Sequence, residues 1–205
     1  MKLSTGFLFV IISIVLLNGC GGEEKKDSLT PKQWQILSYL PQDTEFLLYM
    51  NLDEVRKTEF WEDYFKASLL KTPGSNWLTD FENKTGVGLK KGVSGFYTAT
   101  TWEGNNLFVI QFSGNIDGVM DYFNNASLFT PGNVNDKKFY ELRTGSLSKF
   151  YFIDDSTLIV INSASYLLSL LEEKRHSLRD NATFVHLINN VKNKQQYFLP
   201  TYIVG

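Results

Sequence analysis

Short blocks of apolar residues, each with a period typical of a helix or a strand, divide the chain from residue 33 onward. An apolar run at residues 46–50 follows the turn signal of residues 41–44 and predicts a buried strand. Residues 33–40, just before this turn, are expected to form a short helix. After the strand, aromatic and apolar residues recur every three or four positions, which predicts an amphipathic helix over residues 54–70.

Cap and turn residues mark the next elements. Ser75 is expected to cap a second short helix, and Gly86 stands where a helix often ends on a left-handed residue. Residues 93–102 and 107–112 are rich in β-branched and aromatic residues and enclose the turn sequence of residues 103–106. These two segments therefore predict a β-hairpin.

One helix and three strands are expected in the middle of the chain. A helix starting near Asn115 would carry four apolar residues on the face that packs on a sheet, namely Ile116, Val119, Met120 and Phe123. Strand-like segments follow at residues 138–142, 147–153 and 157–162, with turn residues between them. Their close succession predicts a meander.

Two helices and a strand complete the pattern. Ser163 is expected to begin a leucine-rich helix, and a second helix with apolar positions 184, 187, 188 and 191 should follow a cap at Asp180 or Asn181. Residues 196–204 predict the last strand, which either pairs inside the sheet or marks the chain as a fragment. The order of elements indicates the α+β class, a mostly antiparallel sheet with helices packed on one face. We expect one such domain over residues 33–205.

The first 19 residues have a different pattern. Lys2 is followed by an apolar stretch at residues 7–17 and then by small and polar residues, the order of a secretory signal peptide. The stretch is shorter than the run of about 20 apolar residues that crosses a membrane. We therefore expect residues 1–19 to be removed, which leaves 186 of the 205 residues.

The end of this leader, Leu17-Asn18-Gly19-Cys20, resembles the lipobox of bacterial lipoproteins. In that motif an aliphatic residue and two small residues precede a cysteine that receives lipid, and Asn18 departs from the usual Ala or Ser. The resemblance implies cleavage before Cys20 and attachment of acyl chains to its sulfur. The alternative is an ordinary cleaved signal followed by a free thiol.

The resemblance also implies an address. A lipid on Cys20 would hold the protein on a membrane of the bacterial cell envelope, and the glycine-rich, charged residues that follow predict a flexible tether within residues 20–32. Gly21 follows the cysteine in place of the Asp that resembles an inner-membrane retention signal in enteric bacteria. This favours the outer membrane.

Composition limits the chemistry. Cys20 is the single cysteine, so the chain can form neither an internal disulfide nor a thiolate cluster for a metal. The 20 basic and 22 acidic residues form no long run of one sign, which argues against a nucleic-acid partner. Aromatic residues make up 15% of the chain; they are expected to fill the core, with a ligand groove as the alternative.

Near-matches to catalytic motifs each lack a required residue. His176 and His186 are the two histidines, and their spacing does not suit a helical metal pair, so we expect both at the surface or at an interface. Asp154 and Asp155 lie between two predicted strands, where Asp commonly makes turn hydrogen bonds. Ser94 lacks the second glycine of a nucleophile elbow and is expected to be an ordinary strand residue. We therefore assign no catalytic, cofactor-binding or metal-ligating residue.

Four segments together resemble uncharacterised bacterial envelope families, which are known as domains of unknown function. The segments are residues 40–46, 51–55, 85–87 and 152–160. Members of these families tend to be longer, with a second related half. The resemblance implies that this chain is about the first half and that its final strand is where the other half would pack; it supplies no catalytic residue.

Three classes of function follow. The first is a non-enzymatic envelope lipoprotein whose domain binds an envelope protein or a polymer. The second is a carrier of lipid or another apolar ligand, for which the aromatic content argues. The third is a hydrolase with an unrecognised site, since a fold does not fix a function.

Mass analysis of the mature polypeptide tests the address directly. We expect a chain that begins at Cys20 and carries fatty acyl groups through a thioether, because the lipobox directs both processing steps. An unmodified thiol, or a leader still attached, would contradict the envelope placement.

Overall fold

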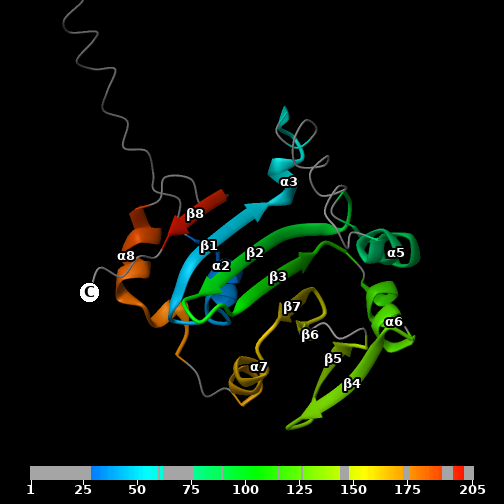
Figure 1. Cartoon of the computed structure of the whole chain (residues 1–205). Coiled ribbons are helices and arrows are strands. Elements are labelled where there is room, and N and C mark those ends of the chain that lie inside the picture. Colours follow the sequence, from blue (N-terminus) through cyan, green and yellow to red (C-terminus); the bar gives the residue numbers. More distant parts are fainter. Residues whose placement is uncertain are drawn as a thin grey trace, which may run out of the picture.

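The computed structural model describes residues 29–59, 61, 76–88, 90–114, 116–125, 127–143, 148–172, 176–190 and 196–200. The expected signal peptide, Cys20 and most of the expected tether lie outside these residues. Within them, no helix is long and apolar enough to cross a membrane. The elements are α2 Pro31–Leu37, β1 Thr44–Asn51, α3 Leu52–Val55, α5 Asn76–Thr85, β2 Val93–Thr101, β3 Asn106–Phe112, α6 Asp117–Asn125, β4 Phe129–Val134, β5 Lys137–Leu142, β6 Lys149–Asp154, β7 Thr157–Ile161, α7 Ala164–Leu171, the 3₁₀ helix η2 Leu178–Asp180, α8 Ala182–Asn190 and β8 Gln196–Pro200 (Figure 1).

The strands form one eight-stranded sheet in the order β4-β5-β6-β7-β3-β2-β1-β8. Every neighbouring pair is antiparallel. The predicted α+β class, the hairpin of β2 and β3, and the meander of β5, β6 and β7 are confirmed. The final strand pairs with β1 and forms one edge of this sheet.

One face of the sheet is covered by helices. Directly opposed residues in an antiparallel pair point to the same face, and the register aligns Tyr49, Tyr97, Val109 and Ile159 in one row. This row is buried in a core that also contains apolar side chains of α2, α7, η2 and α8. We call this side the covered face.

Among the described residues, helices cover the opposite face only in part. Phe123 of α6 is 3% exposed and packs on the rings of Phe129, Tyr140 and Phe150, with centroid distances of 4.5, 5.3 and 5.3 Å. The centre of the Phe81 ring in α5 lies 6.5 Å from the centre of the Phe123 ring. Helices α5 and α6 therefore cover the side of this face formed by β4 to β7, so helices are not confined to one face (Figure 1).

Several helices begin where the sequence predicts. Ser163 Oγ accepts a hydrogen bond from Tyr166 N at 3.2 Å and caps α7, as expected. Of the two candidate caps for α8, Asn181 is the one used, because its Oδ1 accepts from Phe184 N at 3.0 Å. Gly86 has a φ of +69° and ends α5 in the predicted left-handed conformation.

The structure differs from the predicted elements in three places. The short helix expected at residues 33–40 is α2, which starts at Pro31 with Thr30 as its cap, and Leu29 is in the core, so the domain begins before residue 33 and the expected tether ends earlier than residue 32. Within the helix expected over residues 54–70, α3 ends at Val55 after starting at Leu52 with Asn51 as its cap, and residues 59 and 61 are helical again; residue 60 and residues 62–75 lie outside the described part. Strand β4 was not predicted, since its Pro131-Gly132 pair is typical of a turn. Edge strands tolerate proline, and β4 lies at an edge.

The burial of Phe123 gives a stability prediction. Phe123→Ala should lower the free energy of unfolding by about 3–5 kcal/mol, because it leaves a cavity among four or more aromatic rings. The matched control is Leu168→Ala on α7, where the side chain is 44% exposed and the loss should stay below about 1 kcal/mol. Urea denaturation measures both; equal losses would contradict this account of the core.

Candidate functional site

The uncovered part of the second face is apolar. The register of β1, β2, β3, β7 and β6 aligns Met50, Phe96, Ile110, Leu158 and Phe152 in one row across five strands. The next row contains Leu48, Thr98, Phe108, Val160 and Phe150. We call the partly exposed apolar members of these rows on β1, β2, β3 and β7, together with Phe46 on β1, the open apolar face: Phe46, Leu48, Met50, Phe96, Phe108, Ile110 and Val160.

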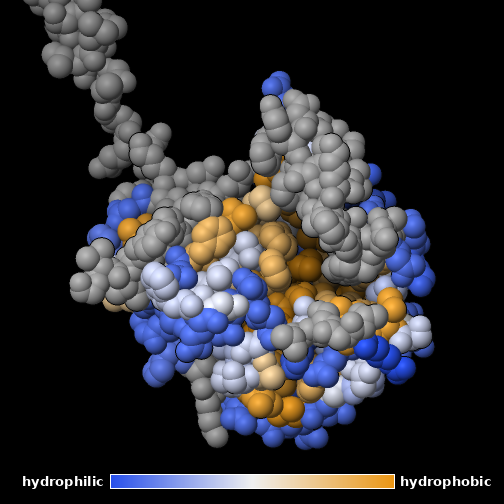
Figure 2. Space-filling model, viewed as in Figure 1, coloured by the Kyte–Doolittle hydropathy of each residue, from blue (hydrophilic) through white to orange (hydrophobic). Residues whose placement is uncertain are grey.

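Two stacked aromatic rings lie at the centre of the open apolar face. The rings of Phe96 and Phe108 lie 5.9 Å apart at an interplanar angle of 27°. Phe108 remains 36% exposed, although a large apolar side chain in the middle of a sheet is usually covered. Figure 2 shows a hydrophobic surface over the middle strands that sinks into a hollow.

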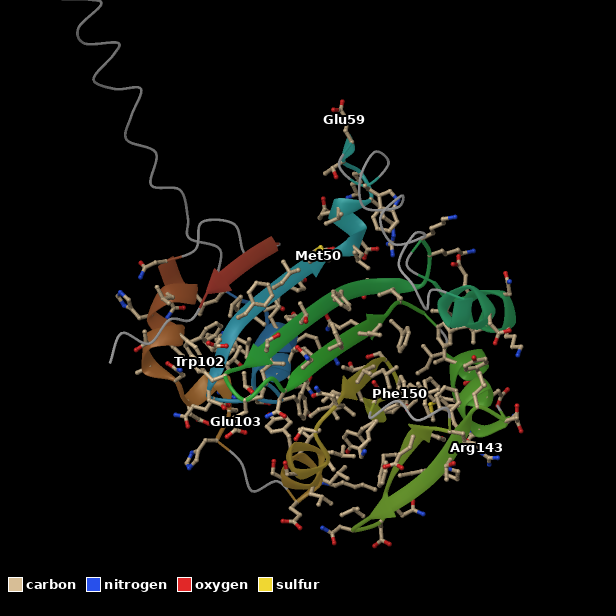
Figure 3. All side chains as sticks on the ribbon, in the orientation of Figure 1. Met50, Glu59, Trp102, Glu103, Arg143 and Phe150 are labelled. Atoms are coloured by element: carbon tan, nitrogen blue, oxygen red, sulfur yellow. The ribbon has the colours of Figure 1, made fainter. Side chains whose placement is uncertain are left out.

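The open apolar face is closed on two sides by packed apolar residues. At the end where β1 finishes, Leu52 and Val55 of α3, Trp61, and Val93 of β2 belong to one buried cluster. Along the side toward β7, α6 covers Phe150 and Leu158, each 3% exposed. In Figure 3, Met50 lies beside α3 at this closed end, whereas Trp102 and Glu103 lie at the hairpin tip at the other end.

The other end of the open apolar face is polar. Thr100 is paired with Phe46 on one side and with Asn106 on the other, in the row beyond Phe108. Thr100 Oγ1 lies 3.0 Å from Asn106 Oδ1, and Asn162 Nδ2 donates to the Gly104 carbonyl oxygen at 3.2 Å. This end is open to solvent at Asn106 and at Trp102, which is 66% exposed.

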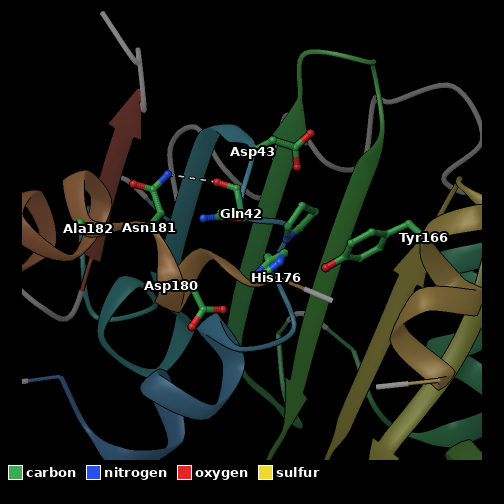
Figure 4. A pocket seen from close by; sticks show the side chains of 8 residues that line it. Gln42, Asp43, Tyr166, His176, Asp180, Asn181 and Ala182 are labelled. Atoms are coloured by element: carbon green, nitrogen blue, oxygen red, sulfur yellow. Dashed lines mark hydrogen bonds between the residues drawn. The ribbon is translucent and has the colours of Figure 1, made fainter. Parts of the chain in front are cut away.

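A second concavity lies beside α8 and the loop before β1. Its volume is about 520 Å³, and Figure 4 shows His176 and Tyr166 facing it. Asn181 Nδ2 donates to the Gln42 carbonyl oxygen at 3.1 Å, so this amide closes a backbone contact. The described residues that line the cleft include no Ser, Thr or Cys side chain that could act as a nucleophile.

Asp180 in this cleft is an ionised acceptor. The backbone N–H and the hydroxyl of Ser177 donate to Asp180 Oδ2 at 2.9 and 2.8 Å. These hydrogen bonds lower the pKa of Asp180 below its ordinary value. A carboxylate with a lowered pKa is a poor proton donor or base near neutral pH.

A third concavity of about 730 Å³ lies on the covered face between η2, α7 and β6. Tyr39 and Tyr151 line it together with Lys137 and Arg179. Lys137 Nζ donates to the Leu171 carbonyl oxygen at 2.9 Å, and the Arg179 guanidinium lies 6.0 Å from the centre of the Trp34 ring. Both cations therefore make contacts within the fold.

The residues singled out from the sequence lie apart from one another. His176 and His186 are both exposed, as expected. Among the described residues, no group of three or more His, Cys, Asp or Glu side chains could hold a metal ion. Ser94 is a residue of β2 whose hydroxyl lies 3.4 Å from the Gln111 carbonyl oxygen, which agrees with its expected role in a strand.

Asp154 makes turn hydrogen bonds, as predicted. Its Oδ1 accepts from the backbone N–H and from the hydroxyl of Ser156, each at 2.9 Å, and its Oδ2 forms an ion pair with Lys32 Nζ at 2.8 Å. Burial by itself raises the pKa of this carboxyl, but these hydrogen bonds outweigh it and lower the pKa from 3.8 to about 2. Asp155 is exposed in the turn.

Tyr122 is held as a neutral donor. Burial, and a hydrogen bond from its hydroxyl to Asp80 Oδ2 at 3.1 Å, raise the pKa of Tyr122 to about 12. The phenol therefore keeps its proton at physiological pH. Its ring packs edge-on against the ring of Phe81 and so joins α6 to α5.

The open apolar face was not identified from the sequence. Its signal was present, because residues 46–50 are continuously apolar and strand β3 has apolar residues at both parities. Such runs predict strands that are buried on both faces. Sequence alone does not show how many helices are available to cover them.

No protein-family model and no curated protein matches this chain. Among solved structures, it is similar to TP0453 in crystal forms I, III and IV, with TM-scores of 0.47, 0.46 and 0.46 and sequence identities of 12%, 11% and 10%. The matches cover 74%, 73% and 68% of this chain and 54%, 54% and 53% of TP0453. The chain thus spans about half the length of those structures.

The Asp154 carboxylate predicts a pH dependence. Because its folded pKa is lowered, it contributes stability above about pH 4, and this contribution is lost as the pH falls toward 2. Lys32→Met should raise the pKa of Asp154 toward 3.8, make the loss of stability with acid smaller, and cost less than about 1 kcal/mol at pH 7, since the pair is over a third exposed on each side.

The control is Lys57→Met, which removes the more exposed ion pair with Glu54. It should leave the pKa of Asp154 unchanged. Carboxyl titration by NMR and urea denaturation at pH 7 and pH 3 give the two readouts. A pKa that stays near 2 in Lys32→Met would show that the ion pair is not a principal cause.

Proposed function

We propose that this protein is a lipid-anchored, non-enzymatic binding protein of the bacterial cell envelope that holds an apolar ligand on the open apolar face. The observation that supports this most directly is the exposure of Phe108 within a row of apolar side chains on a half-covered sheet. An exposed contiguous apolar surface on a folded domain commonly marks an interaction site.

The energetics favour occupancy of this face. Each apolar side chain gains about 1.5–3 kcal/mol when it is fully removed from water. The seven side chains of the open apolar face are already partly buried, so a ligand would gain on the order of 1 kcal/mol from each that it covers. The sum, about 7 kcal/mol, is less than the roughly 8 kcal/mol of a micromolar complex. Burial of the ligand's own apolar surface must therefore supply the rest and offset the entropic cost of association.

The shape supports a small ligand over a folded partner. Small-molecule sites are concave and mostly apolar with a few polar groups, whereas the core of a protein interface is broader and flatter. The open apolar face is walled by α6 on one side and by α3, Trp61 and Val93 at one end. A protein partner would have to fit between these walls.

The expected anchor brings the site to its ligand. A tether from Cys20 to Leu29 can extend at most about 30 Å. Leu29 is 6% exposed and belongs to the core of the covered face. The domain would then stay within one bilayer thickness of the membrane surface, where apolar ligands are concentrated.

Photo-crosslinking in cells tests this proposal with the intact lipoprotein. A benzophenone amino acid replaces Phe108 on the open apolar face or, as the control, Leu168 on α7. We expect irradiation to add a mass in the range of a single lipid or metabolite at position 108 and not at position 168, because α7 packs on the covered face.

Two outcomes would overturn the proposal. Position 108 joined to a protein would assign the open apolar face to a macromolecular partner. The same low yield of adducts at positions 108 and 168 would show that the face holds no ligand.

A further inference from the structure

The open apolar face changes in polarity along the direction of its strands, and this gradient bears on what the ligand is. This inference rests on the proposed function. The row through Met50 and Ile110 is apolar at every position, and the row through Phe108 includes Thr98. The row after that contains Thr100 and Asn106 beside Phe46. An occupant that matches this surface is apolar at one end and polar at the other.

The packed residues at one end of the open apolar face determine which end of the ligand lies there. Beyond Met50 the open apolar face meets Trp61 and Val93, which are 4% and 3% exposed. Its apolar end is therefore closed. Beyond Phe108 the open apolar face reaches Asn106, which is exposed. A polar group would lose its hydration at the closed end without gaining a partner there, whereas at the open end it keeps contact with water.

The length of the open apolar face along β3 suits an acyl chain. Phe112 pairs with Val93 at the closed end and lies six residues beyond Asn106 on β3. At about 3.4 Å per residue this distance is about 20 Å. The acyl chains of one membrane leaflet extend about 15 Å, half of the hydrocarbon thickness of a bilayer.

The polar end is uncharged along its row. The Thr100 hydroxyl donates to Asn106 Oδ1, and the side-chain amides of Asn106 and Asn162 both donate to the Gly104 carbonyl oxygen. Each amide nitrogen keeps a second N–H, and the Thr100 oxygen can still accept a hydrogen bond, so this capacity is left for a ligand. The charged residue that the hairpin turn adds is Glu103, whose carboxylate lies 3.5 Å from Asn105 Nδ2. Hydroxyl and amide groups match a head group that both donates and accepts hydrogen bonds, while a carboxylate repels an anionic one.

We infer that the ligand is an amphiphile with an acyl tail and an uncharged, hydroxyl-bearing head group. Its tail lies along β1, β2 and β3 toward Trp61, and its head lies at Thr100 and Asn106. The chemical class is that of a monoacylglycerol or a glycolipid, in contrast to a fatty acid or an anionic phospholipid.

Three photoreactive probes with the same acyl chain separate the head groups: a monoacylglycerol, the free fatty acid and an alkyltrimethylammonium ion. Each carries a diazirine at the methyl end of its tail and is added to the intact lipoprotein in phosphatidylcholine vesicles. We expect the monoacylglycerol to label the protein at least about fivefold more than the fatty acid, which the Glu103 carboxylate repels. It should also label more than the alkyltrimethylammonium ion, whose head group can neither donate nor accept a hydrogen bond. The labelled peptides should contain residues of the closed end, such as Phe112 and Ile116.

A second monoacylglycerol probe with the diazirine on its glycerol tests the orientation. It should label peptides that contain residues 98–106. Labelling at the closed end by this probe, or at the open end by the tail probe, would overturn the orientation.

Thr100→Val tests the head-group contact without changing the shape of the side chain. Loss of one hydrogen bond should lower labelling by the monoacylglycerol about two- to tenfold and leave labelling by a diazirine-bearing alkane unchanged. The matched control is Thr130→Val on the edge strand β4, where the threonine is exposed, and it should label as the unmodified protein does.

The outcomes test the head-group assignment separately from the proposed binding of an apolar ligand. Equal labelling of the open apolar face by all three probes would overturn the head-group assignment and leave an apolar-ligand site in place. Absence of labelling by every probe, the alkane included, would overturn the function as well.

Discussion

The structure depends on an imbalance between the apolar surface of its sheet and the helices that cover it. Strands β1, β2, β3 and β7 carry apolar side chains on both faces. In the part of the chain that the structure describes, α2, α7 and α8 cover one face, and α5 and α6 cover the β4 to β7 side of the other. Because apolar area removed from water is the main driving force of folding, a fold that leaves Phe96, Phe108 and Ile110 partly exposed retains a surface on which that force can still act.

The anchor and the open apolar face complement each other. Lipid on Cys20 would supply membrane attachment without an apolar segment in the domain itself, so the apolar residues of the strands need not serve insertion. Their exposure is then available for binding. The two other clefts lack this character, since Asp180 and Asn181 in one and Lys137 in the other are engaged in contacts within the fold.

Local signals predicted most of the fold, and the open apolar face shows where they stop. Alternation and turn residues predicted the hairpin of β2 and β3, and cap residues predicted the starts of α7 and α8, because these features depend on neighbours within four residues. Strand β4 was missed because Pro131 and Gly132 are tolerated only by virtue of its edge position, which is a tertiary property. Likewise, the apolar run at residues 46–50 predicts a strand covered on both sides, whereas the exposure of its second face depends on helices placed far along the chain. Asp154 is the converse case, since its turn hydrogen bonds were predicted but its ion pair with Lys32, 122 residues away, was not.

Accessibility of the open apolar face in living cells tests the central claim most directly. Thr98→Cys places a thiol on β2, directly opposite Phe108 of β3 and two residues from Phe96. Thr130→Cys places one on the edge strand β4, at an exposed position. If the face holds a ligand in the envelope, a membrane-permeant maleimide should modify position 130 in cells and in delipidated protein alike, but position 98 only after delipidation. Equal modification of position 98 in both settings would contradict the account.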